Sequence, residues 1–168
     1  NLLREEIEIK NLSYYGFFPE KSDNVYLKLT SFSRTAGDEI KKALIELKEK
    51  GDIKSIVLDL RGNPGGLLDA AVDVAEKFVE SNSLIVSVIG RDSTDLKKFN
   101  SKEKPLAGDI KLVVLIDQNS ASASEIVAGA IQDHDRGVIL GTKSFGKGLV
   151  QTIIPVTAKT SLKMTTAK

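Results

Sequence analysis

Hydrophobic residues occur along this chain in short blocks whose spacing alternates between the pattern of a strand and that of a helix. Apolar runs typical of buried strands lie at Ile56–Leu60, Leu84–Ile89, Leu112–Ile116 and Val138–Gly141. Apolar residues recur at helical spacing in Ala36–Lys50, Leu67–Val79 and Ala121–Asp133. Strands that alternate with helices favour parallel pairing through right-handed crossovers, with both faces of the sheet covered. The pattern therefore predicts an α/β fold.

The segments outside this alternation show other patterns. Glu6–Lys10 and Val25–Leu29 alternate apolar and polar residues, which predicts two half-buried strands joined across an aromatic turn at Tyr14–Phe18. The polar stretch 90–108 is expected to be an exposed connection. Leu149–Val156 and Ser161–Thr166 follow each other without an intervening helix, so the chain should end in an antiparallel hairpin.

Composition narrows the classes of function. The chain has 168 residues, enough for one domain with a hydrophobic core, and its 24 basic residues nearly balance its 23 acidic ones. This balance points to neither nucleic acid nor an anionic membrane as a partner. There is no cysteine, and the single histidine, His134, excludes any metal site that needs several imidazoles. No apolar run approaches the roughly 18 residues that span a bilayer.

A serine-rich segment stands where a buried strand passes into a helix. Backbone N–H groups in the first turn of such a helix have no intrahelical partner, so they can stabilise an oxyanion beside a hydroxyl nucleophile. Ser122 is one candidate nucleophile of this segment. The alternative is structural, because Ser122 with Glu125 three residues later also fits a capping box, and Ser120 is a good N-cap residue.

A serine nucleophile needs a base. His134 lies twelve residues further along the same predicted helix, roughly 18 Å away at 1.5 Å per residue, and cannot reach Ser122. Lys147, in the glycine-rich stretch GTKSFGKG, is the next candidate. Partial desolvation beside glycine and phenylalanine would lower the pKa of its amine and allow it to accept a proton. The alternative is an ordinary exposed loop lysine.

The same stretch matches the first part of a phosphate-binding loop, but the match is incomplete. Gly148 follows the lysine where magnesium coordination requires Ser or Thr, and the next residues favour a strand and not a helix. Nucleotide binding is therefore not expected. A second glycine-rich turn, RGNPGG at Arg61–Gly66, could either aim a backbone N–H into a cleft or simply form a tight connection between strand and helix.

Three of these motifs together resemble the C-terminal processing, or tail-specific, serine peptidases. The matching segments are DLRGNPGG at 59–66, SASASEIVAGAIQD at 120–133 and GTKSFGKGLVQ at 141–151, within a resemblance that runs from about Arg4 to Lys168. The resemblance implies the Clp protease and crotonase-like fold, with a mostly parallel sheet. It further implies that Ser122 is the nucleophile, Lys147 the base and Gln151 the residue that holds the lysine amine. The backbone N–H groups of Ala123 and of Gly66, with Gly65 as second choice, would form the oxyanion hole.

The resemblance also sets expectations about the whole protein. Residues 1–168 would form one peptidase core domain, without the PDZ domain that usually precedes it and without the continuation that usually follows. Such a peptidase would cleave protein substrates with apolar C-terminal tails, act outside the cytoplasm, and need no metal, nucleotide or organic cofactor. A homo-oligomer is compatible with it. The main rival is a non-catalytic binding module of the same fold, against which the joint presence of Ser122, Lys147 and Gln151 argues.

Overall fold

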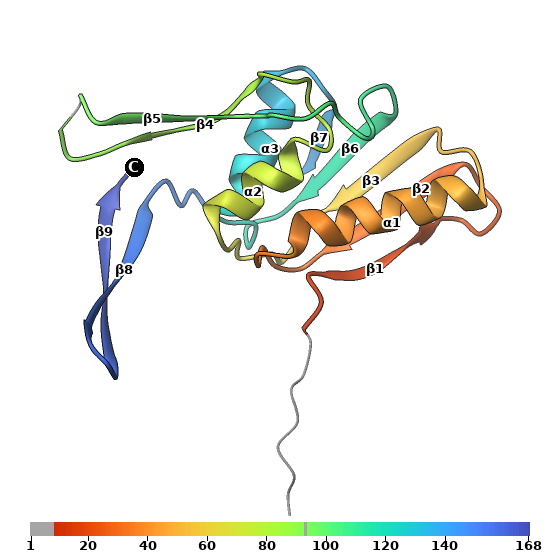
Figure 1. The fold of residues 1–168 in the computed structure, drawn as a ribbon. Coiled ribbons are helices and arrows are strands. Elements are labelled where there is room, and N and C mark those ends of the chain that lie inside the picture. The colour runs from red at the N-terminus through yellow and green to blue at the C-terminus, as the bar shows by residue number, and fades with distance from the viewer. Residues whose placement is uncertain (1–8, 93) are drawn as a thin grey trace, which may run out of the picture.

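The computed structural model describes residues 9–92 and 94–168 (Figure 1). Its helices are α1 (Ala36–Lys50), α2 (Leu68–Ala75) and α3 (Ala123–Asp133). The strands are β1 (Leu12–Phe17), β2 (Asn24–Leu29), β3 (Ser55–Asp59), β4 (Leu84–Ile89), β5 (Leu96–Asn100), β6 (Lys111–Ile116), β7 (Val138–Gly141), β8 (Val150–Thr157) and β9 (Thr160–Ala167). The expected helix at 36–50 is confirmed, with Gly51 at its C-terminal end.

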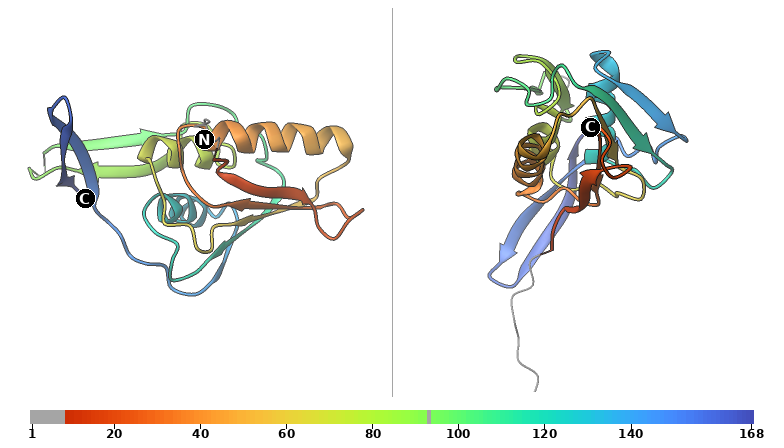
Figure 2. Two further views of the ribbon diagram at one scale, coloured as in Figure 1. Left: turned by 90° about the horizontal axis from the view of Figure 1, so that it is seen from below. Right: turned by 90° about the vertical axis from the view of Figure 1, so that its right-hand side faces the viewer.

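The main sheet has five strands in the order β1-β2-β3-β6-β7. β1 is antiparallel to β2, and the other neighbours are parallel. Each parallel connection advances in the same direction across the sheet, so right-handed crossovers place the three helices on one face (Figures 1 and 2). The expected α/β class, with a mostly parallel sheet flanked by helices, is confirmed.

The hydrophobic core lies between the helices and this one face. Residues on β2, β3 and β6 alternate between fully buried and less buried positions, and α1 buries the stripe that its spacing predicts. The expectation that helices cover both faces is therefore wrong for the described chain. The second face carries half-buried residues such as Tyr26, Val57 and Val113. Such one-sided burial is normal for a sheet whose crossovers all lie on one side.

The sequence pattern misassigned several segments. The aromatic residues 14–17 belong to strand β1 and not to a turn, because Tyr14, Tyr15 and Gly16 pair with β2. Of the strand expected at Glu6–Lys10, residues 6–8 lie outside the described part of the chain, and residues 9 and 10 are not in a strand. The polar stretch 90–108 contains β5, which pairs antiparallel with β4 outside the main sheet. The sequence pattern did not indicate β5 because this strand contains lysines and its side chains are mostly exposed.

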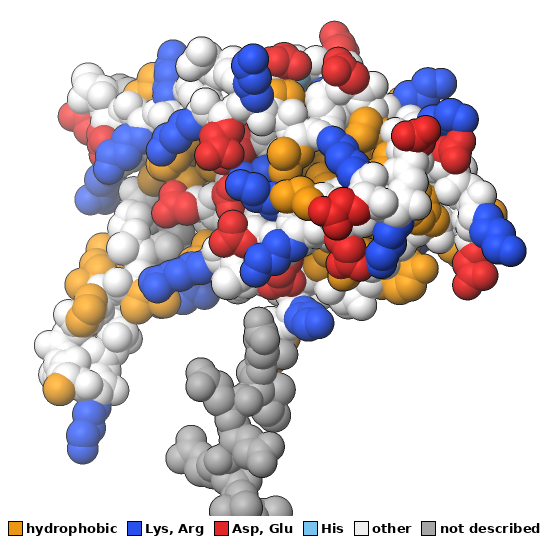
Figure 3. Space-filling model, turned by 45° about the vertical axis from the view of Figure 1, so that its right-hand side comes forward, with side chains coloured by type: hydrophobic (Ala, Val, Ile, Leu, Met, Phe, Trp, Pro, Cys, Tyr) orange, Lys and Arg blue, Asp and Glu red, His pale blue; other side chains and the backbone are white. Residues whose placement is uncertain are grey.

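The C-terminal hairpin of β8 and β9 is confirmed as expected. It projects from the body of the molecule, and its free end carries exposed hydrophobic side chains (Figures 2 and 3). The hairpin is attached near its base by paired backbone hydrogen bonds between Ile89 of β4 and Lys168. In the described residues, no helix is long and apolar enough to cross a membrane.

Candidate active site

The topology of the sheet brings three of the sequence motifs to one edge. β3, β6 and β7 run in parallel, and Asp59, Leu115 and Leu140 lie in register across them. Each strand is followed at its carboxyl end by one motif: RGNPGG after β3, the serine segment after β6, and GTKSFGKG after β7. In open sheets of this type, ligands bind outside the carboxyl ends of the strands.

Ser122 is held in a sharp bend at the start of α3. Its backbone has φ 56° and ψ −111°, a conformation that non-glycine residues rarely adopt, and its side chain is half-buried. The flanking serines differ from it, because both are fully buried and hydrogen-bonded. The Ser120 hydroxyl donates to the carbonyl of Leu60 at 2.8 Å. Ser120 is thus a structural residue and not the N-cap, while Ser122 alone of the three lines an open cavity.

A cavity of about 410 Å³ brings together most of the candidate residues, but the buried Ala123 is not among those that line it. Ser122, Lys147, Gln151 and Gly66 all line it, in the space between the body of the molecule and the base of the hairpin. Its apolar lining residues come from α2, β4, α3 and the hairpin: Leu68, Val86, Val88, Ile126, Val150 and Ile153. The fold therefore brings together residues that lie up to 85 positions apart in the sequence, from 66 to 151.

The surroundings of Lys147 differ from the expectation. Lys147 lies in an irregular loop before β8 begins at Val150, so it does not share a strand with Gln151. Lys147 is also exposed, and the neighbouring Phe145 is 67% exposed, so this phenylalanine does not desolvate the amine. Both Lys147 and Gln151 reach the cavity nevertheless.

Two backbone N–H groups were expected to form an oxyanion hole beside Ser122. Within the described part of the chain, the N–H groups of Gly66 and Ala123 donate to no protein acceptor. The N–H of Gly65 is already engaged, since it donates to Asn63 Oδ1 at 2.9 Å. Gly65 serves packing instead: its φ is +94°, and a Cβ there would lie 2.5 Å from the carbonyl oxygen of Ala121. The geometry thus favours Gly66 over Gly65 as the donor.

The glycine-rich turn and the serine segment are joined by buried hydrogen bonds. The carbonyl of Asn63, a fully buried residue, accepts from the N–H of Ala121 at 3.1 Å and from the hydroxyl of Ser124 at 3.0 Å. In the opposite direction, the carboxylate of Asp117 accepts from the N–H of Gly62 at 2.9 Å. These bonds set the turn and the bend at Ser122 in a fixed relation to each other.

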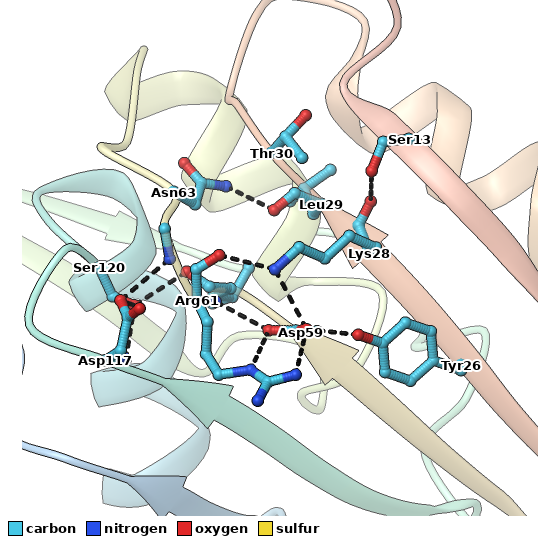
Figure 4. Close-up of polar contacts among 12 residues, drawn as sticks. Ser13, Tyr26, Lys28, Leu29, Thr30, Asp59, Arg61, Asn63, Asp117 and Ser120 are labelled. Atoms are coloured by element: carbon cyan, nitrogen blue, oxygen red, sulfur yellow. Dashed lines mark hydrogen bonds and ion pairs between the residues drawn. The ribbon is translucent and has the colours of Figure 1, made fainter.

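A buried carboxylate anchors the start of the same turn (Figure 4). Asp59, 1% exposed, accepts from Tyr26 and from two nitrogens of Arg61 at 3.0 and 2.8 Å, and its Oδ2 lies 3.1 Å from Lys28 Nζ. Burial alone would raise the pKa of Asp59, but hydrogen bonds from Arg61, Tyr26 and Lys28 outweigh it and hold the pKa well below its usual range. Asp59 therefore stays ionised and fixes the first residues of the turn that ends at Gly66.

Glu125 connects the segment of Ser122 to the loop of Lys147. Its Oε2 accepts from the backbone N–H of Ser122 at 2.7 Å and of Lys147 at 2.9 Å. Its Oε1 accepts from the hydroxyl of Ser144 at 2.7 Å and the N–H of Gly146 at 2.6 Å. Burial would raise the pKa of this carboxyl, but these hydrogen bonds outweigh it and lower the pKa. The expected capping box between Ser122 and Glu125 is therefore present, and its glutamate also holds the loop of Lys147.

Glu125→Gln is expected to displace this loop. An amide keeps one acceptor oxygen but in either orientation turns an NH₂ group towards at least one backbone N–H donor, so kcat/KM should fall by up to about 10²-fold. Ser144→Ala removes one of the contacts and should reduce kcat/KM less.

Because the folded-state pKa of Glu125 is lowered, its contribution to stability is present above the unfolded-state pKa and is lost as pH falls through the folded-state value. The melting temperatures of wild type and Glu125→Gln should therefore converge in acid. Unchanged kcat/KM in Glu125→Gln would show that other contacts hold the loop.

The structure places His134 away from the cavity and a strand directly after the GTKSFGKG loop. His134 ends α3, and its Nε2 lies 2.8 Å from the carbonyl oxygen of Leu84, which it satisfies; it does not line the cavity. The GTKSFGKG loop leads into strand β8, so the helix N-terminus that a phosphate-binding loop requires does not follow it.

Comparisons with known proteins agree with this geometry. The model of peptidase family S41 matches residues 23–168. A carboxy-terminal-processing protease of Bartonella bacilliformis is 43% identical over 169 residues, which cover 99% of this chain and 38% of that protein. A chloroplastic carboxyl-terminal-processing peptidase of Arabidopsis thaliana is 40% identical over 143 residues, covering 85% of this chain and 27% of that protein. The chain thus spans less than two-fifths of these relatives.

A solved structure shows the same fold. The photosystem II D1 C-terminal processing protease superposes with a TM-score of 0.73 at 34% sequence identity, covering 86% of this chain and 37% of that one. The expected fold class is confirmed by this likeness as well as by the sheet topology.

Proposed function

Because this chain belongs to peptidase family S41, a family of serine peptidases, we propose that it hydrolyses peptide bonds near the carboxyl end of protein substrates through an acyl-enzyme on Ser122. The observation that carries the proposal is the cavity in which Ser122, in a strained bend at a helix N-terminus, lies with Lys147 and the free N–H of Gly66. A strained bend of this kind presents a serine hydroxyl to substrate.

The residues divide the chemistry as follows. Lys147, as the neutral amine, accepts the proton of the Ser122 hydroxyl while Oγ attacks the carbonyl carbon of the substrate. The N–H groups of Gly66 and Ala123 stabilise the resulting oxyanion. Lys147 returns the proton to the leaving amine, and water then releases the acyl group from Ser122 with the same lysine as base. Because Lys147 is exposed in the free protein, a substrate that fills the apolar cavity would supply the desolvation that favours its neutral form.

Mapping of cleavage sites tests the proposed substrate class. An unstructured protein with an apolar C-terminal tail, incubated with the full-length protein, should yield fragments that mass spectrometry assigns to cuts near the carboxyl end. The same protein with a polar tail of uncharged residues should be cleaved more slowly. Cuts distributed evenly along both substrates would contradict cleavage near the C-terminus, even if proteolysis itself were observed.

Gln151 is proposed to position the lysine amine. Its amide can only hydrogen-bond, so Gln151→Ala should reduce kcat/KM less than Lys147→Ala does, without lowering the melting temperature much, since the residue is exposed. Adding Gln151→Ala to Lys147→Ala should cost little more than Lys147→Ala alone, because residues that act as a unit are not additive. Losses that simply multiplied would mean that Gln151 acts independently of Lys147.

We also infer that the full-length protein acts outside the cytoplasm. The inference is supported by the chloroplastic assignment in the name of the Arabidopsis relative and by the family to which the chain belongs. Fractionation of the source cells followed by immunodetection checks it. Recovery of the protein with the cytoplasmic fraction alone would contradict it.

A further inference from the structure

The inner face of the hairpin carries a charged side chain that the proposed chemistry does not use. Gln151 and Ile153 are two residues apart on β8, so their side chains point to the same face, and both line the cavity. Lys163 of β9 lies directly opposite Ile153 and lines the cavity as well. Two residues of an extended strand span about 6.6 Å. Lys163, opposite Ile153, is therefore displaced from Gln151 along the hairpin by about the length of two residues of an extended substrate.

The cavity is strongly one-sided in charge. Its charged lining residues are Lys147, Lys163 and Lys168, and no aspartate or glutamate of the described part of the chain lines it. Among the ion pairs of residues 9–92 and 94–168, none involves Lys163 or Lys168. The surrounding lining includes Val86, Val88 and Ile153, and such apolar walls strengthen the attraction between opposite charges.

We propose that Lys163, assisted by Lys168, binds a carboxylate of the substrate within about two residues of the bond that is cut. The proposal rests on the proposed function and specifies its substrate further. The carboxylate can come from the α-carboxyl group of a short tail or from an aspartate or glutamate side chain. The site would thus favour cuts a short, defined distance from a negative charge.

Two matched pairs of peptides separate these sources. In the first pair, both termini are blocked and one position holds either glutamate or glutamine. The comparison is repeated for each position up to three residues on either side of the cut. In the other, the same sequence ends shortly after the cut with a free or an amidated carboxyl terminus. The carboxylate member of at least one pair should be cleaved with roughly threefold higher kcat/KM at low salt, since exposed ion pairs contribute little more. This preference should weaken as ionic strength rises from about 0.02 M to about 0.5 M.

Variants assign the preference to Lys163. Lys163→Gln should remove most of it, and Lys163→Arg should retain it. Lys159→Gln is the matched control, because Lys159 lies in the turn of the same hairpin and does not line the cavity. A preference that survives Lys163→Gln, Lys168→Gln and their combination would overturn the proposal, as would equal cleavage of both members of every pair by the wild type. These outcomes leave the proposed function intact provided that cleavage still requires Ser122, whereas cleavage that is unaffected by Ser122→Ala would refute the proposed function itself.

Discussion

Ser122→Ala is expected to lower kcat/KM by at least about 10⁴-fold, because removal of a nucleophile that acts as a unit with its base abolishes covalent catalysis and leaves only binding and the oxyanion hole. Melting temperature should fall only slightly, since the alanine retains the Cβ and loses the capping contact of the hydroxyl with the N3 backbone, a cost of about 1 kcal/mol. Residual activity is best measured with a sensitive fluorogenic peptide in the full-length protein.

The same segment offers a matched control. Ser124→Ala removes a buried hydroxyl that donates to the carbonyl of Asn63, and it should cost about 1 kcal/mol of stability. Its activity at a temperature well below unfolding should stay within an order of magnitude of the wild type. If Ser122→Ala and Ser124→Ala lost activity to the same degree, the special role of Ser122 would be contradicted.

Lys147→Arg is expected to be inactive to nearly the same degree as Ser122→Ala, although it keeps the positive charge. A guanidinium does not give up its proton in proteins, so it cannot accept one from Ser122. In the wild type, only the neutral amine can act as base, and kcat/KM should therefore increase with pH. Stability should be almost unaffected, because Lys147 is exposed and its loop is held through backbone N–H groups.

Lys143→Arg, in the same loop but outside the cavity lining, is the control and should retain activity. If Lys147→Arg still cleaved substrate and its kcat/KM depended on pH as in the wild type, Lys147 would be excluded as the base.

Much of the fold could be predicted because most of its strands and helices have the spacing of apolar residues that is typical of each. The helix at 36–50 and the strands at 84–89 and 138–141 have the predicted bounds. Failures occurred where tertiary contacts decide. The aromatic residues 14–17 form a strand only because β2 is available to pair with them, and β5 is polar because it forms a two-stranded ribbon outside the core. Periodicity also cannot show which face of a sheet the helices cover.

The sequence indicated which residues belong to the candidate site, but not the hydrogen bonds that hold them in place. Three motifs follow three strands that turn out to be parallel neighbours, which is why separate loops meet at one edge. The capping pattern did not reveal that Glu125 links Ser122 to the loop of Lys147, because its other partners, the hydroxyl of Ser144 and two backbone N–H groups, lie about 20 residues away. Likewise, nothing in the order of residues indicated that Asn63 would engage the N–H of Gly65 and leave that of Gly66 free.

The most direct test of the central claim is to locate the acyl group itself. A reaction of the full-length protein with a peptide substrate, quenched in acid within the first turnover, should yield a covalent adduct with the mass of the amino-terminal part of the substrate. Peptide mapping should place that adduct on Ser122, and it should be absent from Lys147→Arg. Turnover that proceeds with no adduct on Ser122, or with the acyl group on another residue, would contradict the mechanism.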